Sequence, residues 1–251
     1  MSQQPNLGEQ AIDKVAELAI SSQLEQTDQL DVVVKTDPLQ LMQGKVETVT
    51  VAAEGMVVKP DLRATAVGIE ANSIAIDPLK VMLGEIVLTE SLSANAHVVL
   101  TERDINQALA SDFLKAKMQN LQIQMQGRPT SLQIEQITLK LPDDQALWLE
   151  VRLKLVEQNE YKQFSAMVKP LLAEAGYCLN LEVIAVEGEG LTLDFVTVLL
   201  NQVEELLDLR NFNLGNISLR LKEISLQPGQ ILLRGGTVIE PGSLNLTDDL
   251  A

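Results

Sequence analysis

Apolar residues at every second position dominate this chain and limit the folds that are open to it. The clearest alternating runs cover residues 49–53, 121–125, 147–155 and 179–185. Polar residues separate the apolar ones, so each run has one dry face and one wet face. This pattern is typical of antiparallel sheet, because strands of a parallel sheet are usually apolar on both faces. The sequence therefore predicts long antiparallel strands.

Two of the alternating runs change phase through an extra residue. Residues 132–141 shift at Glu135-Gln136, and residues 217–226 shift at Lys222-Glu223. An extra residue in an alternating run indicates a β-bulge, which bends the strand and increases its twist. We therefore expect a strongly curved sheet, with hairpin turns at residues 126–129 and 227–230.

Three stretches repeat with the period of a helix. The first covers about residues 7–24, the second starts with a capping box at Thr101 and Asp104, and the third follows Thr192. The second falters at residues 111–112 and then resumes as far as Met118. The sequence thus combines a few helices with a sheet, which is an α+β pattern.

An eight-residue motif occurs twice, each time after a predicted strand. Residues 37–44 read DPLQLMQG, and residues 77–84 read DPLKVMLG. Asp suits a helix N-cap, Pro suits the first helical turn, and Gly suits the left-handed residue that ends a helix. We expect two short helical plugs, each with two apolar residues and a Met turned inward.

Charge and composition exclude several classes of function. The chain has 251 residues, 19 Lys+Arg against 35 Asp+Glu, a net charge of -16 and no basic cluster. This balance disfavours nucleic acid as a partner and also long-range attraction to an anionic membrane. One His and one Cys exclude an internal disulfide and a four-ligand Cys/His zinc site. We expect no metal, no cofactor and no catalytic residue.

The residues whose types often serve in catalysis or phosphate binding lack the other residues of a known motif in this sequence. His97 lies in a strand-like run and Cys178 flanks a strand, so we interpret both as structural. Gly188 and Gly190 lack the further residues of a phosphate-binding loop and indicate a strand-to-helix turn. An enzyme acting on a lipid or a glycan is therefore the least favoured hypothesis. Convergent carboxylates with strongly shifted pKa values in a cleft would revive it.

The inward-facing aliphatic residues leave two hypotheses open. They either fill a solid core or line a tube that admits an acyl chain. Aromatic residues are only 3 % of the chain, and a flexible aliphatic lining suits hydrocarbon. From the residues alone the solid core is favoured, and it corresponds to an acidic structural or scaffold protein that binds a protein partner.

Several segments of the chain resemble a known family. They are LDVVVKTDPL at 30–39, IDPL at 76–79, VLTERDIN at 99–106, EELLDLRNF at 204–212 and LRL at 219–221. In these segments the chain resembles the LmeA-like bacterial proteins, once a domain of unknown function and now described as phospholipid-binding. The resemblance implies a fold similar to tubular lipid-binding (TULIP-like) domains. In that fold a highly curved antiparallel sheet wraps a long helix and leaves an apolar groove for lipid.

The resemblance favours a non-catalytic protein that holds phospholipid or other lipid acyl chains between helix and sheet. Lipid transfer and envelope or membrane maintenance are the roles it suggests. We expect one lipid-binding-like domain at residues 7–239 and a flexible tail at 240–251. The residues expected to line the groove are Leu18, Val49, Val51, Val67, Ile69, Leu121, Ile123, Leu149, Val151, Leu153, Leu181, Val183, Leu219 and Leu221.

The start of the chain has neither the basic nor the apolar region of a signal peptide. No apolar stretch approaches the roughly 20 residues that a membrane-spanning helix needs. We therefore expect a cytoplasmic protein, peripheral to a membrane, whose membrane contact is transient.

Overall fold

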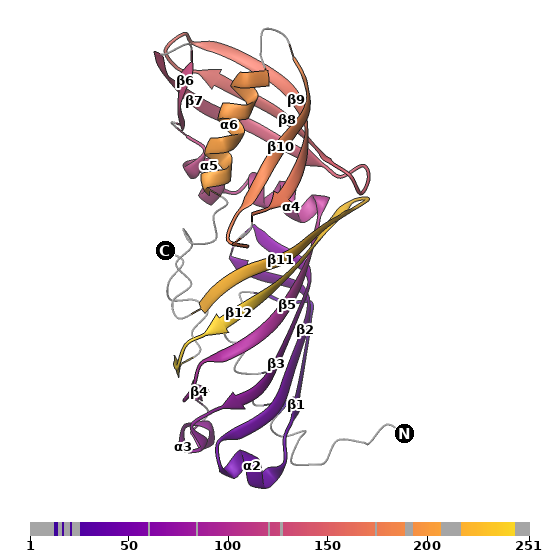
Figure 1. The fold of residues 1–251 in the computed structure, drawn as a ribbon, viewed down its shortest axis with the longest axis vertical. Helices are drawn as coiled ribbons and strands as arrows, with labels where there is room; N and C mark the ends of the chain where they lie inside the picture. The colour runs from indigo at the N-terminus through magenta and orange to yellow at the C-terminus, as the bar shows by residue number, and fades with distance from the viewer. Residues whose placement is uncertain are drawn as a thin grey trace.

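Two antiparallel sheets lie end to end along the long axis of the molecule (Figure 1). The computed structural model describes residues 26–59, 61–83, 85–119, 121–125, 128–173, 175–188, 193–206 and 217–243, with residues 13, 14, 17 and 21. The prediction of long antiparallel strands is confirmed, because every strand pairing between the described residues is antiparallel.

The six-stranded sheet combines strands from both ends of the chain. In spatial order its strands are β1 (Gln29–Lys35), β2 (Lys45–Lys59), β3 (Leu62–Ala75), β5 (Leu92–Thr101), β12 (Gln230–Ile239) and β11 (Ile217–Gln227). A two-stranded sheet of β4 (Val87–Leu88) and β13 (Gly242–Ser243) accompanies it. The six-stranded sheet twists and curls into a half-barrel, as Figure 1 shows.

The five-stranded sheet is built from the middle of the chain. In spatial order its strands are β10 (Leu179–Glu187), β9 (Glu160–Leu172), β8 (Leu147–Leu155), β7 (Arg128–Lys140) and β6 (Leu121–Met125). One helix, α6 (Leu193–Leu206), packs across it and contacts β10 and β6. The other helices are α2 (Pro38–Met42), α3 (Pro78–Met82), α4 (Glu102–Leu109) and α5 (Asp112–Lys117).

Both predicted bulges are confirmed. The pairing of β7 with β8 shifts between Ile134 and Gln136, and the pairing of β11 with β12 shifts between Leu221 and Glu223. The turn at residues 227–230 connects β11 to β12, and Gly229 there has a positive φ of 77°. The other predicted turn includes residues 126 and 127, which lie outside the described part, although Met125 and Arg128 pair.

The structure does not show the expected long helix wrapped by a curved sheet. α6 has only 14 residues and lies on the five-stranded sheet, not inside the curled six-stranded one. Phe195, Val196, Leu199 and Leu200 of this helix are buried against the five-stranded sheet. Of the helix expected at residues 7–24, only residues 13, 14, 17 and 21 are described, and all four are helical.

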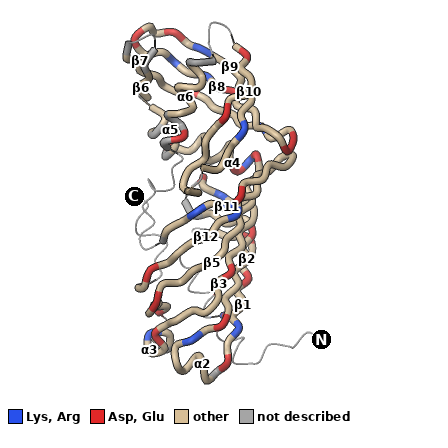
Figure 2. The backbone as a smooth tube through the Cα atoms, in the orientation of Figure 1, with Lys and Arg blue, Asp and Glu red and all other residues tan. Residues whose placement is uncertain are grey.

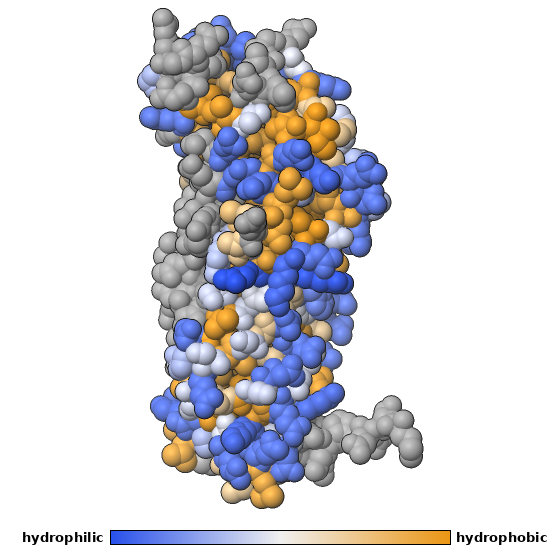
Figure 3. Space-filling model, viewed as in Figure 1, coloured by the Kyte–Doolittle hydropathy of each residue, from blue (hydrophilic) through white to orange (hydrophobic). Residues whose placement is uncertain are grey.

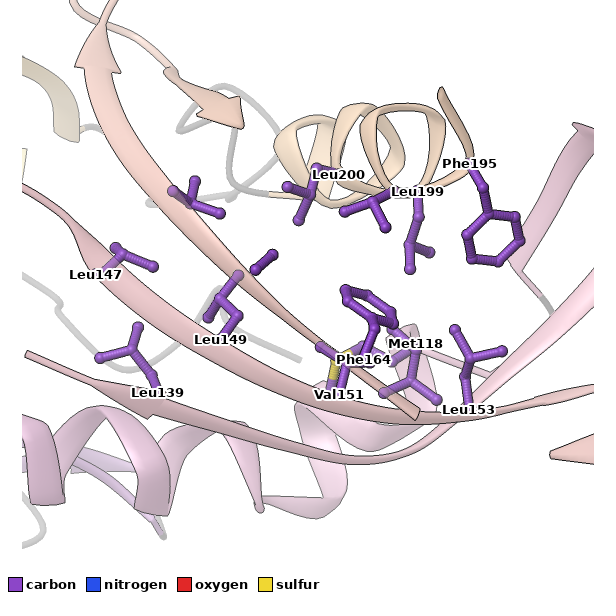
Figure 4. Packing of buried hydrophobic residues seen from close by; sticks show 14 of the residues in the cluster. Met118, Leu139, Leu147, Leu149, Val151, Leu153, Phe164, Phe195, Leu199 and Leu200 are labelled. Carbon is purple, nitrogen blue, oxygen red and sulfur yellow. The ribbon is translucent and has the colours of Figure 1, made fainter. Parts of the chain in front are cut away.

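The core between α6 and the five-stranded sheet is solid. Figure 4 shows Phe195, Leu199 and Leu200 of α6 facing Phe164 and Leu149 of the sheet. The side chains of Leu132, Leu153, Val168 and Val196 are 0 % exposed. Such close packing leaves no room for a guest molecule without moving the helix.

α4 joins the two sheets through polar contacts on both sides. The capping box predicted at its start is confirmed, and its buried Asp104 accepts hydrogen bonds from Arg63 Nη1 at 3.0 Å and Thr65 Oγ1 at 2.5 Å, both on β3. On the opposite side the Asn106 side chain bonds both backbone groups of Leu139 on β7, at 2.7 and 2.8 Å. α4 therefore satisfies the part of β7 that extends beyond its pairing with β6, which covers residues 128–132.

A second contact joins the sheets at the bulge of β11. The backbone N–H of Leu221 donates to the carbonyl of Gly176 at 2.8 Å, and Arg220 donates to the Tyr177 hydroxyl at 2.6 Å. Gly176 has a φ of 71°, and a Cβ there would lie 2.3 Å from the carbonyl oxygen of Leu221. Only glycine permits this close approach.

The repeated motif forms two short helices, but its apolar residues do not all turn inward. Asp37 and Asp77 cap α2 and α3 as predicted, each followed by Pro at the first helical position. A helix of five residues covers little more than one turn, so it can bury only one side. Leu41 and Val81 pack on the sheet, whereas Leu39, Met42, Leu79 and Leu83 are 66–77 % exposed. The expected inward orientation is wrong for Leu39, Met42 and Leu79.

Candidate functional site

The six-stranded sheet carries one continuous apolar face. Directly paired residues of antiparallel strands point to the same side of a sheet, so the register defines rows across it. Three adjacent rows, which we call the apolar face, read Val34–Val49–Ala71–Ala94–Thr237–Leu219, Val32–Val51–Ile69–Ala96–Gly235–Leu221 and Leu30–Ala53–Val67–Val98–Leu233–Ile224. Thr237 is the only polar residue in the three rows.

The size of the side chains varies along these rows. β5 and β12 contribute small ones, which we call the small-residue strip: Ala94, Ala96, Gly235 and Thr237. In the second row the strip is flanked by the larger Ile69 and Leu221, whereas in the third row β5 and β12 carry Val98 and Leu233. Glycine is required at position 235, because a Cβ there would lie 2.7 Å from the carbonyl oxygen of Arg220 beside the bulge.

Thr237 is an unusual residue within the small-residue strip. Its side chain is 7 % exposed, and its Oγ1 is buried without a hydrogen-bond partner in the described structure. An unsatisfied buried hydroxyl costs about 1–3 kcal/mol, so such groups usually have a partner in the functional state of a protein.

The structure divides the fourteen predicted lining residues between the two sheets. Six lie on the apolar face: Val49, Val51, Val67, Ile69, Leu219 and Leu221. Seven belong to the core under α6: Leu121, Ile123, Leu149, Val151, Leu153, Leu181 and Val183. Leu18 lies outside the described residues. The two groups differ in exposure, since Ile123, Leu149, Val151 and Leu153 are 0–6 % exposed whereas five of the first six are only partly buried.

An open depression of about 590 Å³ lies beside β9 and the end of β10. Its lining is Tyr161, Lys162, Gln163, Phe164, Ser165, Glu187 and Gly188. None of the fourteen predicted residues is among them. The lining is mostly polar, which does not suit an acyl chain.

The groups with potential for chemistry are dispersed. The His97 ring covers Gly68 on the face opposite the apolar one, where a Cβ would lie 2.0 Å from His97 Cε1. Cys178 is a half-buried free thiol. Among the residues that the structure describes, no three His, Cys, Asp or Glu side chains gather to hold a metal.

Among the described residues, two carboxyl groups have clearly shifted pKa values, and both serve structural contacts. Burial by itself would raise the pKa of Asp104, but hydrogen bonds from Thr65, Thr101 and Arg63 outweigh it and lower that pKa. Hydrogen bonds from Ser131 lower the pKa of Glu157. Neither carboxylate lines the depression beside β9. They do not form the convergent pair that a hydrolytic mechanism needs.

The small-residue strip is not evident from the sequence alone. Its signal is present in the sequence as Ala94 and Ala96 at alternate positions and as Gly235 before Thr237. Small residues in an alternating run have low strand propensity, and their alignment into a strip can be recognised only when the neighbouring strands are known. The register between β5 and β12 supplies that knowledge.

Comparisons with known proteins identify one matching family. A family model described as LmeA-like phospholipid-binding matches residues 5–236. No curated protein and no solved structure matches the chain. None of the helices that the structure describes has the length and apolar character needed to cross a membrane.

Proposed function

Because the chain belongs to the LmeA-like phospholipid-binding family, we propose that it is a non-catalytic protein that holds phospholipid acyl chains along the apolar face. The observation that carries this proposal is the set of three rows across all six strands in which Thr237 is the one polar residue. Each CH₂ group that leaves water for such a surface gains about 0.8 kcal/mol. An acyl chain lying along the small-residue strip contacts larger aliphatic side chains on both flanks.

The apolar face suits hydrocarbon better than the core under α6 does. In that core the central residues are fully buried and already in contact with one another. On the apolar face Val32, Val34, Ala71 and Ala94 are also buried, but Val51, Ile69 and Val98 are only partly buried. A surface with residual exposure gains from covering by lipid, whereas a filled core gains nothing.

Thr237 offers the one hydrogen-bonding group within the rows. Its unpartnered hydroxyl is buried in this structure, so it can donate to an ester carbonyl oxygen only of a phospholipid that displaces the atoms now covering the strip. The hydrogen bond would fix how far the lipid slides along β5 and β12. This gives the site a polar reference point within an otherwise apolar surface.

The basic test is to extract the purified protein with organic solvent and to identify the lipids by mass spectrometry. We expect phospholipid to be recovered. We also expect the protein to move a fluorescent phospholipid between donor and acceptor vesicles, which is the lipid-transfer role. Absence of both bound lipid and transfer contradicts the proposal.

Filling the small-residue strip is expected to expel the lipid. The side chain of Ala96→Phe projects over the strip, so most of the extractable phospholipid should disappear while the melting temperature stays close to that of wild type. Ser93→Phe is the matched control, because Ser93 is exposed on the same strand and points to the opposite face. The smaller Ala96→Leu covers the case in which phenylalanine prevents folding. Equal lipid content in all variants would place the lipid elsewhere.

Thr237→Val is expected to separate lipid affinity from stability. Valine has nearly the shape of threonine and removes the unsatisfied hydroxyl, so the free energy of unfolding of the lipid-free protein should stay the same or rise by about 1 kcal/mol. The affinity for phospholipid should fall about fivefold, the loss of one hydrogen bond. Urea unfolding of delipidated protein and titration with short-chain phosphatidylcholine measure the two quantities. Lower stability with unchanged affinity would contradict the assignment.

A further inference from the structure

Four large apolar side chains are exposed together at one end of the molecule. Leu39 and Met42 on α2 are 70 % and 77 % exposed, and Leu79 and Leu83 on and just after α3 are 66 % and 74 % exposed. Figure 3 shows orange atoms at this end, over the helices that Figure 1 places there. We call these four residues the apolar tip. Exposed apolar groups of this kind usually mark a contact surface.

Helix caps, a backbone hydrogen bond and packing on a buried cluster hold the apolar tip in place. Asp37 caps α2 through the Leu39 N–H at 2.8 Å, and Asp77 caps α3 through the Leu79 N–H at 2.9 Å. The two motifs are tied to each other because Ile76 N–H donates to the carbonyl of Gly44 at 2.8 Å. Beneath them, Leu41 and Val81 pack on the buried cluster that contains Val34 and Val46. The outward side chains are therefore held in position and do not fold back on the sheet.

The charges beside the apolar tip favour phospholipid over a purely apolar partner. Both signs occur at this end of the molecule (Figure 2). Among the acidic groups, Asp37 and Asp77 cap the helices, Glu47 accepts a hydrogen bond from Gln40, and Glu85 pairs with Lys80 at 3.1 Å. Lys35 and Lys45 are exposed and form no ion pair with other described residues. The ammonium groups of these lysines can contact lipid phosphates while the neighbouring apolar side chains contact acyl chains.

From these observations we propose that the apolar tip inserts into the outer layer of a phospholipid bilayer. The inference rests on the proposed function, since it makes the bilayer the source of the bound lipid. Val34, which lies under the tip, belongs to the first row of the apolar face. Insertion therefore brings the end of that face next to the bilayer, so an acyl chain can pass from one to the other. The opposite end, with α6, points away from the membrane (Figure 1).

A second copy of the chain is a poorer occupant of this surface. Stable protein interfaces bury about 800 Å² on each partner, usually over 20–30 residues. Four side chains on and just after two five-residue helices fall well short of that. A bilayer needs no matching shape, and partial burial of several aliphatic side chains is enough for reversible binding.

Flotation with phosphatidylcholine vesicles tests the proposal. The variant Leu39→Ser/Met42→Ser/Leu79→Ser/Leu83→Ser is expected to lower the vesicle partition coefficient on the order of 100-fold. The control variant Val156→Ser/Ile184→Ser/Val238→Ser removes exposed apolar side chains from other parts of the surface, where they are 38–51 % exposed, and should bind like wild type. Equal loss in both variants, or no loss in either, overturns the proposal.

A fluorescence experiment gives the position directly and does not rely on lost binding. In a Trp148→Phe background, tryptophan at Leu39→Trp should shift its emission to the blue on vesicle addition and be quenched by lipids with brominated chains. Ile184→Trp should show neither effect. Quenching of tryptophan at residue 184 but not at residue 39 overturns the proposed orientation. A concentration-dependent dimer in ultracentrifugation also overturns it, if the tip variant loses both the dimer and vesicle binding.

Lipid extraction distinguishes this inference from the proposed function. If the tip variant loses vesicle binding and wild type yields phospholipid, both proposals are supported. If wild type yields no phospholipid but still binds vesicles through the tip, the proposed lipid binding on the apolar face is contradicted and the proposed insertion of the tip is supported. If wild type yields phospholipid and the tip variant binds vesicles normally, the reverse holds.

Discussion

Asp104→Asn is expected to lower the free energy of unfolding by about 3 kcal/mol, because it leaves buried donors without their charged acceptor. Asp104 is 2 % exposed and accepts hydrogen bonds from Arg63 Nη1, Thr65 Oγ1, Thr101 Oγ1 and the Thr101 N–H. An amide can accept at only one of its two terminal atoms, so at least one donor is lost. Urea unfolding at neutral pH measures the change.

Asp28→Asn is the matched control for this prediction. Asp28 pairs with the same guanidinium at 3.0 Å, but its side chain is 61 % exposed. Exposed ion pairs contribute about 0–1 kcal/mol, so the control should be close to wild type. A similar loss in both variants would show that the Arg63 charge, and not the burial of Asp104, determines the effect.

The effect of Asp104→Asn should also depend on pH. The pKa of Asp104 is lowered in the folded protein, so the unfolded chain takes up a proton at a higher pH than the folded one. The stabilisation is therefore complete well above pH 3.8, the ordinary value, and is lost as the pH falls through the lower folded value. Unfolding curves of wild type and Asp104→Asn should converge in acid. A difference that stays constant with pH would contradict this role of the carboxylate.

Leu153→Ala is expected to cost about 3 kcal/mol of stability and to leave the bound lipid unchanged. Leu153 is 0 % exposed in the core under α6, and truncation of such a residue leaves a cavity. Because the proposed lipid lies on the other sheet, phospholipid per folded molecule should equal that of wild type. Thermal unfolding and lipid extraction of the same sample measure both quantities. Loss of lipid from a folded Leu153→Ala protein would place the acyl chains under α6.

Local features of the fold followed well from the sequence. The bulges at Glu135-Gln136 and Lys222-Glu223, the capping box at Thr101 and Asp104, and the caps at Asp37 and Asp77 depend on residues close in the chain. Each of these caps and bulges can be recognised from residue types and their spacing within a short segment of the chain. These predictions are confirmed because no distant partner is needed to form them.

The division into two sheets did not follow from the sequence. Strands with period two have the same pattern whichever neighbour they pair with, so Val51 and Val151 looked equivalent as lining residues. The structure places Val51 on the apolar face and Val151 in the core under α6. Side-chain direction in the short helices was also unpredictable, because a helix of barely one turn has no period from which to read a buried side.

The sheet that carries the apolar face can be completed only late in folding. Its central strand β5 pairs with β12, joining Thr101 to Gln230 and Leu92 to Ile239, residues more than half the chain length apart. Contacts between such distant residues form slowly, because a large loop must close first. Until β11 and β12 arrive, β5 is an open edge beside exposed aliphatic side chains, a template for pairing with other chains. During synthesis the half that carries the apolar face is thus the half most in need of protection from aggregation.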